Sequence, residues 1–98
     1  MNFEKYLKNI EYPKQKSSWN IAGTLQNGFY KFDTRPIQDN SKVCSFNTKA
    51  DKIVFYIDNK YIVVDTKELI TYLKKNKIKD VHLQNVLLNL EWNIIIND

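Results

Sequence analysis

The chain has 98 residues, 43% of them hydrophobic and 13% aromatic, and it carries a formal net charge of +4. This size and composition exclude a disordered chain and predict one hydrophobic core, so we expect a single domain over residues 1–98. Arg35 is the only arginine among 15 basic residues, and a charge dominated by lysine suits attraction to phosphates better than the reading of bases.

The first predicted element is a short amphipathic helix over residues 3–11. Asn2 is a favourable residue before a helix, and Pro13 prevents the helix from continuing. The helical spacing is carried by four apolar residues: Phe3, Tyr6, Leu7 and Ile10. We expect this apolar stripe to face the core.

Three strands are predicted in the next third of the chain. Two of them, over residues 18–24 and 29–34, flank the Asn27-Gly28 dipeptide, which is typical of a hairpin turn. A polar loop follows, and a short third strand is expected over residues 43–46.

A second hairpin is predicted at the centre of the sheet. Residues 53–57 and 61–64 are rich in β-branched and aromatic side chains, which favour strands. The polar residues 58–60 between them have the chemistry of a tight turn.

Two helices are predicted after this hairpin. Asp65 and Glu68 have the spacing of a capping box, and an apolar stripe follows, so we expect a helix over residues 66–75. Asp80 is a suitable capping residue for another helix. The apolar positions of that helix are Leu83, Val86, Leu87 and Leu90.

A closing strand is predicted over residues 92–96, which contain three consecutive isoleucines. The chain has no internal repeat and no linker that would divide it. We therefore expect an α+β fold, in which two or three helices pack on one face of a largely antiparallel sheet of five or six strands.

The sequence predicts a cytoplasmic protein without membrane association. Its first residues lack the basic start and the apolar stretch of a secretory signal. Asp58 and Lys60 interrupt the longest apolar stretch far short of the roughly 20 residues of a membrane-spanning helix.

Few residues are available for chemistry, and we expect no catalytic, metal-binding or cofactor-binding residue. His82 is the only histidine and Cys44 the only cysteine, which leaves too few zinc ligands and no evident base beside a nucleophile. Gly23 and Gly28 fit no phosphate-binding loop. Cys44 lies in a β pattern, so we expect a buried thiol.

Two Asp-X-Lys triplets have the residue types of a magnesium-dependent nuclease site. The first spans residues 58–60 in the predicted turn, and the second spans residues 65–67 at the start of the predicted helix. A turn and a helix cap both explain an aspartate at these positions, so we assign no metal site to either triplet.

Residues 46–69 resemble the part of restriction-endonuclease-like PD-(D/E)XK proteins that follows the active site. In those proteins a Thr-Lys-Ala-Asp segment, here residues 48–51, leads into a hairpin and then into a helix that opens with Thr and Leu. The resemblance implies a related fold and a link to nucleic-acid systems. It implies no catalytic residue, because in the segment 29–31 Phe29 stands where the acid of the family's acid-X-Lys strand belongs.

The clearest candidate surface is a lysine cluster at the end of the helix predicted over residues 66–75. It consists of Lys74, Lys75, Lys77 and Lys79. Lysines complement the dipole at the end of a helix, and the functional alternative is contact with phosphates or with an acidic protein. Lys14 and Lys16 would extend this surface if the fold brought them near.

The first hairpin supplies a second candidate surface. It consists of Trp19, Phe29, Lys31 and Arg35. Alternate residues of a strand face opposite sides, so Tyr30 and Phe32 are expected to share one face, which can build the core. Phe29 and Lys31 then face outward.

The leading functional hypothesis is a non-enzymatic binding protein. It would be a small phage or mobile-element accessory or inhibitor, in the style of anti-CRISPR and anti-restriction proteins, that docks on a nucleoprotein enzyme or its nucleic-acid groove. The second hypothesis is a domain that binds nucleic acid directly through its lysine clusters. A metal-dependent PD-(D/E)XK-type nuclease is the only enzymatic alternative. Affinity that falls steeply with salt favours the second hypothesis, direct binding of nucleic acid. Magnesium-dependent cleavage of nucleic acid favours the third hypothesis, the nuclease.

Overall fold

The largest element of the fold is a six-stranded sheet with the strand order β1-β2-β3-β5-β6-β8. Its strands are β1 (Lys8–Glu11), β2 (Ile21–Leu25), β3 (Gly28–Pro36), β5 (Lys52–Ile57), β6 (Lys60–Asp65) and β8 (Asn93–Asn97). All neighbouring strands are antiparallel except β3 and β5, which are parallel. The largely antiparallel sheet predicted from the sequence is confirmed.

The computed structural model describes residues 3–36, 42–44, 48–75, 80–82 and 89–98, and the side chains of all of these except 36, 42–44 and 80–82. The remaining elements are a short 3₁₀ helix η1 (Phe3–Tyr6), the helix α1 (Thr66–Lys75) and a two-stranded antiparallel sheet of β4 (Lys42–Cys44) and β7 (Asp80–His82). The fold is α+β, as predicted. The described residues contain one α-helix, fewer than the two or three expected.

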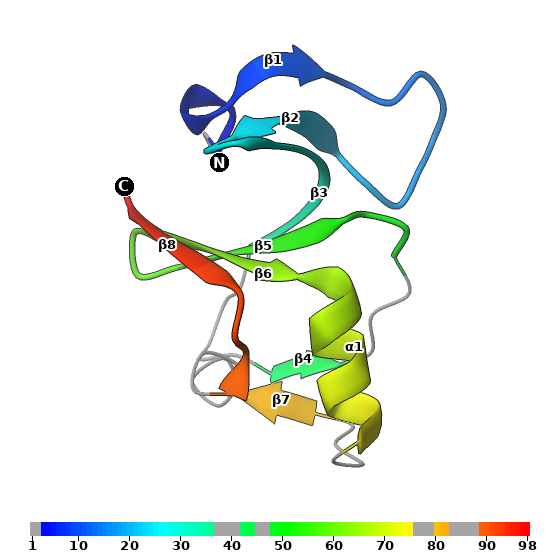
Figure 1. Cartoon of the computed structure of the whole chain (residues 1–98), viewed down its shortest axis with the longest axis vertical. Coiled ribbons are helices and arrows are strands. Elements are labelled where there is room, and N and C mark those ends of the chain that lie inside the picture. The colour runs from blue at the N-terminus through cyan, green and yellow to red at the C-terminus, as the bar shows by residue number, and fades with distance from the viewer. Residues whose placement is uncertain (1–2, 37–41, 45–47, 76–79, 83–88) are drawn as a thin grey trace.

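The long strand β3 joins two layers of the molecule. Its first half, residues 28–32, pairs with β2, and its second half, residues 32–36, pairs with β5. The strand bends between these halves, so that β1 and β2 stack over β5, β6 and β8 (Figure 1). The helix α1 and the β4–β7 pair lie on the opposite side of β5 and β6.

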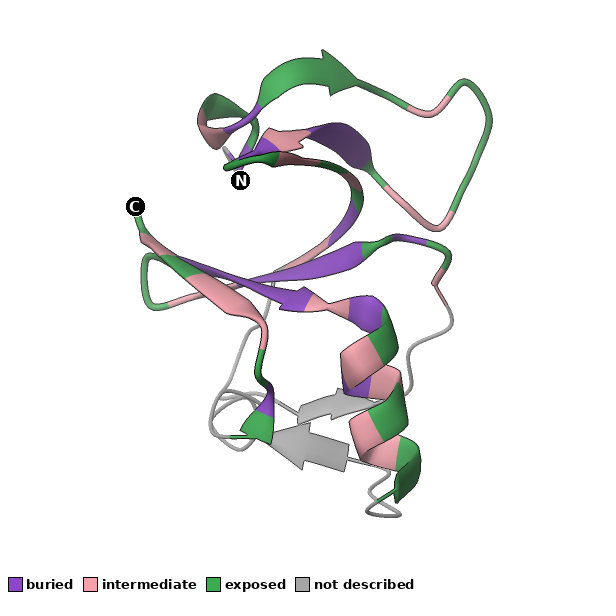
Figure 2. Cartoon of the chain, in the orientation of Figure 1, coloured by how far each residue is buried: buried purple, intermediate pink, exposed green. Residues whose placement is uncertain are grey.

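Two hydrophobic cores fill the spaces between these layers. The inner core lies inside the bend of the sheet and contains Phe3, Leu7, Ile21, Leu25, Phe32, Val54, Tyr61 and Val63. The outer core lies between the sheet and α1 and contains Ile53, Phe55, Ile62, Val64, Leu69 and Leu90. Both faces of β5 and β6 are therefore buried (Figure 2), which explains why their sequences are apolar without alternation.

The central hairpin and α1 confirm the sequence predictions. Asp58 and Asn59 form the turn with φ values of 50° and 61°, the left-handed conformation that a two-residue hairpin turn of this kind needs. Asp65 caps α1, because its Oδ2 accepts a hydrogen bond of 2.9 Å from the backbone N–H of Glu68. The closing strand predicted over residues 92–96 is β8.

The predicted helix over residues 3–11 is wrong beyond its first turn. Only η1 is helical, and the following residues form β1, an exposed edge strand paired with β2. A nine-residue helix gains little stability on its own, whereas pairing with β2 satisfies the backbone of β1. Gly23 permits the close approach, because a Cβ atom at this residue would lie 3.0 Å from Leu7 Cβ.

The first hairpin forms, but its turn lies one residue earlier than predicted. Gln26 and Asn27 make the turn, Gln26 with a φ of 55°, and Gly28 is the first residue of β3. Gly28 is needed for a different reason: a Cβ atom there would collide with the ring of Tyr30. The predicted strand 18–24 begins only at Ile21.

The second predicted helix is wrong at its start, because Asp80 lies in β7 and pairs with Cys44 of β4. Most of that prediction, over residues 83–88, lies outside the described residues, and Leu90 is buried in the outer core. The third predicted strand is present as β4, although residues 45–47 and the side chain of Cys44 lie outside the description. The buried thiol therefore stays a prediction.

Candidate functional site

A groove of about 820 Å³ opens between the first hairpin and α1. Phe29 and Tyr30 of β3 form one wall, and residues 48–52 form the floor. The other wall is one face of α1 and consists of Thr66, Lys67, Ile70, Thr71 and Lys74.

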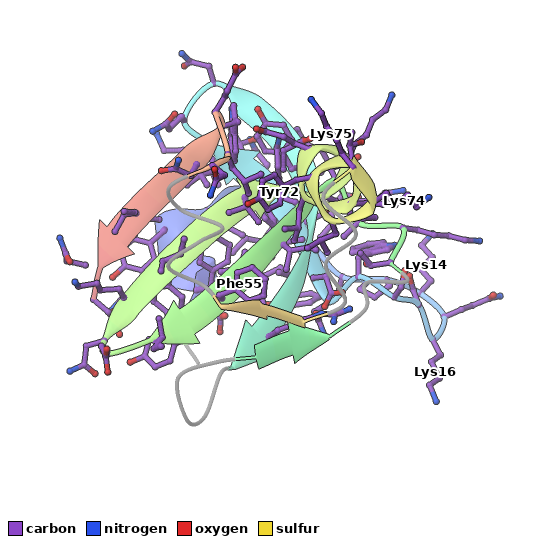
Figure 3. All side chains as sticks on the ribbon, turned by 90° about the horizontal axis from the view of Figure 1, so that it is seen from below. Lys14, Lys16, Phe55, Tyr72, Lys74 and Lys75 are labelled. Atoms are coloured by element: carbon purple, nitrogen blue, oxygen red, sulfur yellow. The ribbon has the colours of Figure 1, made fainter. Side chains whose placement is uncertain are left out.

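The two faces of α1 explain how its lysines reach the groove. Residues three, four and seven apart lie on one face of a helix, so Lys67 and Lys74 point to the same side. The opposite face carries Leu69, Tyr72 and Leu73, which pack in or against the outer core. Figure 3 shows Lys74 directed away from the sheet and Tyr72 directed toward it. Burial of the apolar stripe thus fixes the direction of both lysines.

Asp51 holds the two walls of the groove together. Its Oδ2 accepts a hydrogen bond of 2.9 Å from the backbone N–H of Lys31, and its own N–H donates to the Lys31 carbonyl over 2.8 Å. Its carbonyl oxygen accepts a third bond, of 3.1 Å, from the N–H of Thr66 at the start of α1. Hydrogen bonds of Asp51 therefore connect the floor of the groove to β3 and to the start of α1.

Lys52 lies below the groove with its charge compensated. The residue is 7% exposed, and its Nζ lies 2.8 Å from Asp65 Oδ1. The same ammonium group lies 3.8 Å from the ring centroid of Trp92 and 4.7 Å from that of Tyr30. The carboxylate and the two aromatic faces offset the cost of burying this cation, so Lys52 is a structural residue.

Asp65 has both carboxylate oxygens engaged. Burial raises the pKa of this carboxyl, but the hydrogen bonds from Lys52 Nζ and from the Glu68 N–H outweigh burial and lower the pKa below its usual range. Asp65 therefore stays ionised down to acid pH. Its two partners, Lys52 and the start of α1, account for it as a structural residue.

The groove carries a net positive charge at its surface. Lys49, Lys67 and Lys74 are exposed along it, and Asp51 is the exposed acid among its lining residues. One oxygen of Asp51 is already engaged by a backbone N–H, and the salt bridges among the described residues involve none of these three lysines. Such a surface attracts anions.

Phe29 brings an aromatic ring to the edge of this charged groove. The residue is 49% exposed, whereas Phe32 of the same strand is fully buried. Lys31 is also exposed, and its Nζ lies 5.4 Å from the ring centroid of the half-buried Trp19. The predicted division of the hairpin into a core face and an outward face is confirmed.

The structure brings some of the predicted partner-binding residues together and separates others. Phe29 and Lys74, which belong to the two surfaces predicted separately, line the same groove. Lys75 is exposed beside Lys74 at the end of α1. Arg35 is half-buried away from the groove, with its Nη2 3.0 Å from Asp33 Oδ2.

The other predicted lysines have different positions. Lys14 and Lys16 are exposed in the segment that follows β1, and they point outward on the same side of the molecule as Lys74 (Figure 3). They can extend the positive surface beyond the groove. Lys77 and Lys79 lie outside the described residues.

Sequence reasoning missed Lys49, Lys67 and Asp51 as residues of the groove. The spacing of seven residues between Lys67 and Lys74 was a visible signal, since it places both on one helical face. Lys49 and Asp51 gave no such signal, because their position depends on the pairing of residues 48–51 with β3 and α1. The hydroxyl of Ser18 helps to fix this segment by accepting a bond of 2.8 Å from the Lys49 N–H.

The described residues contain no group of three or more acids, histidines and cysteines that could hold a metal ion. Within the same part of the chain, no helix has the length and apolar character needed to cross a membrane. Comparison of the chain with protein-family models, with curated proteins and with solved structures finds no match.

Proposed function

We propose that the protein is a non-enzymatic domain that binds single-stranded nucleic acid in the groove between the first hairpin and α1. The observation that carries this proposal is that Phe29 and Lys74 line one groove, with Lys49 and Lys67 beside them. Proteins that bind single strands combine a positive groove for the phosphates with aromatic rings on which the bases stack.

The residue types of the groove support a single strand over a duplex. In a single strand the bases are free to stack on Phe29, whereas in a duplex they are already stacked on one another. Lysine attracts phosphate as a point charge and carries little sequence information. We therefore expect binding with weak sequence preference.

The sign of the charge favours one of the two binding hypotheses over the other. An inhibitor that fills the nucleic-acid groove of an enzyme must complement the positive charge of that groove, and the groove of this protein is itself positive. The positive groove favours nucleic acid as the direct partner. An inhibitor or accessory of a nucleoprotein enzyme would use the same groove by docking on the nucleic-acid component.

The structural roles of the aspartates support a binding function without catalysis. Asp58 forms a tight turn, and Asp65 caps α1 and pairs with Lys52. Neither Asp-X-Lys triplet belongs, among the described residues, to a group of three or more acids, histidines and cysteines that could hold a metal ion.

The test is a comparison of affinities for a single-stranded and a double-stranded DNA of equal length, measured by fluorescence anisotropy. We expect the single strand to bind at least about tenfold more tightly at low salt, because stacking on an aromatic ring contributes about 1–3 kcal/mol per base. Equal affinity for both forms, or no binding to either, would contradict the proposal. Incubation with Mg²⁺ should leave both DNAs uncut.

A further inference from the structure

The two edges of the six-stranded sheet differ in how they are protected. Proteins usually shield an edge strand with charged residues, bulges or prolines, because its unpaired backbone groups attract other strands. The edge strand β1 follows this rule: it has a register irregularity between Lys8 and Glu11, and Asn9 has a φ of 56°. The edge strand β8 has no charged residue from Asn93 to Asn97 and pairs with β6 in unbroken register.

The backbone groups of β8 that face outward can be identified. The N–H of Asp98 donates to the carbonyl of Asn59 over 2.9 Å. Because hydrogen-bonded pairs alternate along an antiparallel ladder, Ile94 and Ile96 direct their N–H and C=O groups to β6. The backbone groups of Asn93, Ile95 and Asn97 therefore point away from β6, at the edge of the sheet that the described residues form.

The sequence of β8 is symmetric about its central residue. It reads Asn-Ile-Ile-Ile-Asn, with Ile95 at the centre and 51% exposed. If β8 of a second copy lay antiparallel to β8 of the first, with the two Ile95 residues opposite each other, Asn93 of the first copy would lie opposite Asn97 of the second. Each outward N–H and C=O group would then meet its complement, and equal side chains would face each other, as a two-fold interface requires.

We propose that β8 pairs with β8 of a second copy of this chain, around a two-fold axis at Ile95, to form a homodimer with a continuous sheet. The contact covers one short strand on each side, so we expect a weak dimer. No residue of β8 lines the groove, so the pairing leaves the grooves of both copies open. The proposal does not depend on what the groove binds.

The first test compares two substitutions on the two edges. Ile95→Lys and Ile10→Lys each place a lysine at an exposed isoleucine of an edge strand, on β8 and β1 respectively. In sedimentation equilibrium the parent should associate to a dimer, and Ile95→Lys should raise the dissociation constant at least about tenfold. Ile10→Lys should change it less than about twofold, because β1 is the protected edge.

The second test measures the register of the pairing in a Cys44→Ala background. Ile95→Cys should form a disulfide-linked dimer on mild oxidation, because the axis places its two copies opposite each other within disulfide reach. Asn93→Cys should not, because its two copies would lie about 14 Å apart along the strands. A parent that stays monomeric at about 1 mM would overturn the proposal. Equal effects of Ile95→Lys and Ile10→Lys, or crosslinking at residue 93 in place of residue 95, would also overturn it.

Discussion

Phe29 illustrates how the alternation of a strand decides the role of a single residue. Its neighbour Tyr30 packs against the inner core, and Phe29 lies on the opposite face of the strand with 49% of its surface exposed, although both residues line the groove. Sequence reasoning predicted this direction from the alternation alone. It did not predict that the ring would lie beside lysines of α1, because nothing local to β3 indicates which element lies next to it.

We predict that Phe29→Ala weakens binding of single-stranded DNA by about fivefold or more, since one stacked base contributes about 1–3 kcal/mol. Tyr12→Ala is the matched control, because Tyr12 is even more exposed, at 63%, and does not line the groove. Anisotropy titrations of the two variants measure the effect. A loss of equal size in both would show that Phe29 has no special role.

Asp65, which lines the groove, is expected to make the stability of the fold depend on pH. Its pKa is lowered in the folded state because its hydrogen bonds to Lys52 and to the start of α1 outweigh burial. A lowered pKa stabilises the fold above the unfolded value of about 3.9, and this stabilisation is lost as the pH falls through the folded value.

We therefore predict that Asp65→Asn reduces the acid sensitivity of the fold. The free energy of unfolding of the parent should fall between pH 5 and about pH 3, and that of Asp65→Asn should fall less over the same range. Urea titrations followed by tryptophan fluorescence measure both values. Asp58→Asn, in the exposed turn, is the control and should behave like the parent. An equal slope in Asp65→Asn would refute the assigned role.

At the scale of elements, Glu68 does not complete the predicted capping box but connects α1 to the segment before β8. Its carboxylate accepts hydrogen bonds of 2.6 and 3.1 Å from the N–H groups of Glu91 and Trp92. Glu68 thus ties α1 to the residues that precede β8. Asp65 makes the cap without the reciprocal bond, which the spacing in the sequence could not distinguish from a full capping box.

Removal of this tie should destabilise the protein. We predict that Glu68→Ala lowers the free energy of unfolding by about 1–3 kcal/mol, because two backbone N–H groups lose a charged acceptor. Glu68→Gln keeps one acceptor oxygen and should cost less. Thermal and urea unfolding measure the difference. Glu11→Ala, on the exposed strand β1, is the control, and a Glu68→Ala variant no less stable than this control would contradict the account.

The elements that could be predicted from the sequence are those with local signals. The central hairpin has two β-rich segments around a turn, and α1 has a cap and an apolar stripe, so both were predicted within one or two residues. The strands β1 and β7 were missed because each exists through pairing with a distant strand, β2 or β4. Their own sequences fit a helix start equally well.

At the scale of the whole molecule, the parallel pairing of β3 with β5 creates the groove. This pairing carries β3 from one layer to the other and sets residues 48–51 between the first hairpin and α1. A parallel pair needs a crossover of a dozen or more residues, and no local pattern of residues indicates where that crossover returns to the sheet. The two candidate surfaces therefore looked separate in the sequence.

The central claim is that the groove, and not net charge alone, binds nucleic acid. The most direct test compares Lys67→Glu/Lys74→Glu, on the groove face of α1, with Lys8→Glu/Lys60→Glu, at exposed positions outside the groove. Both double variants lower the formal net charge from +4 to zero. The measurement is affinity for single-stranded DNA as a function of salt concentration.

We predict that the groove variant binds at least about tenfold more weakly at low salt, with a salt slope shallower by about 1.4, since each phosphate contact on a single strand contributes about 0.7. The control variant should keep the parent's slope and lose much less affinity. Equal losses of affinity and slope in the two variants would contradict the claim, because the binding would then depend on overall charge and not on the groove.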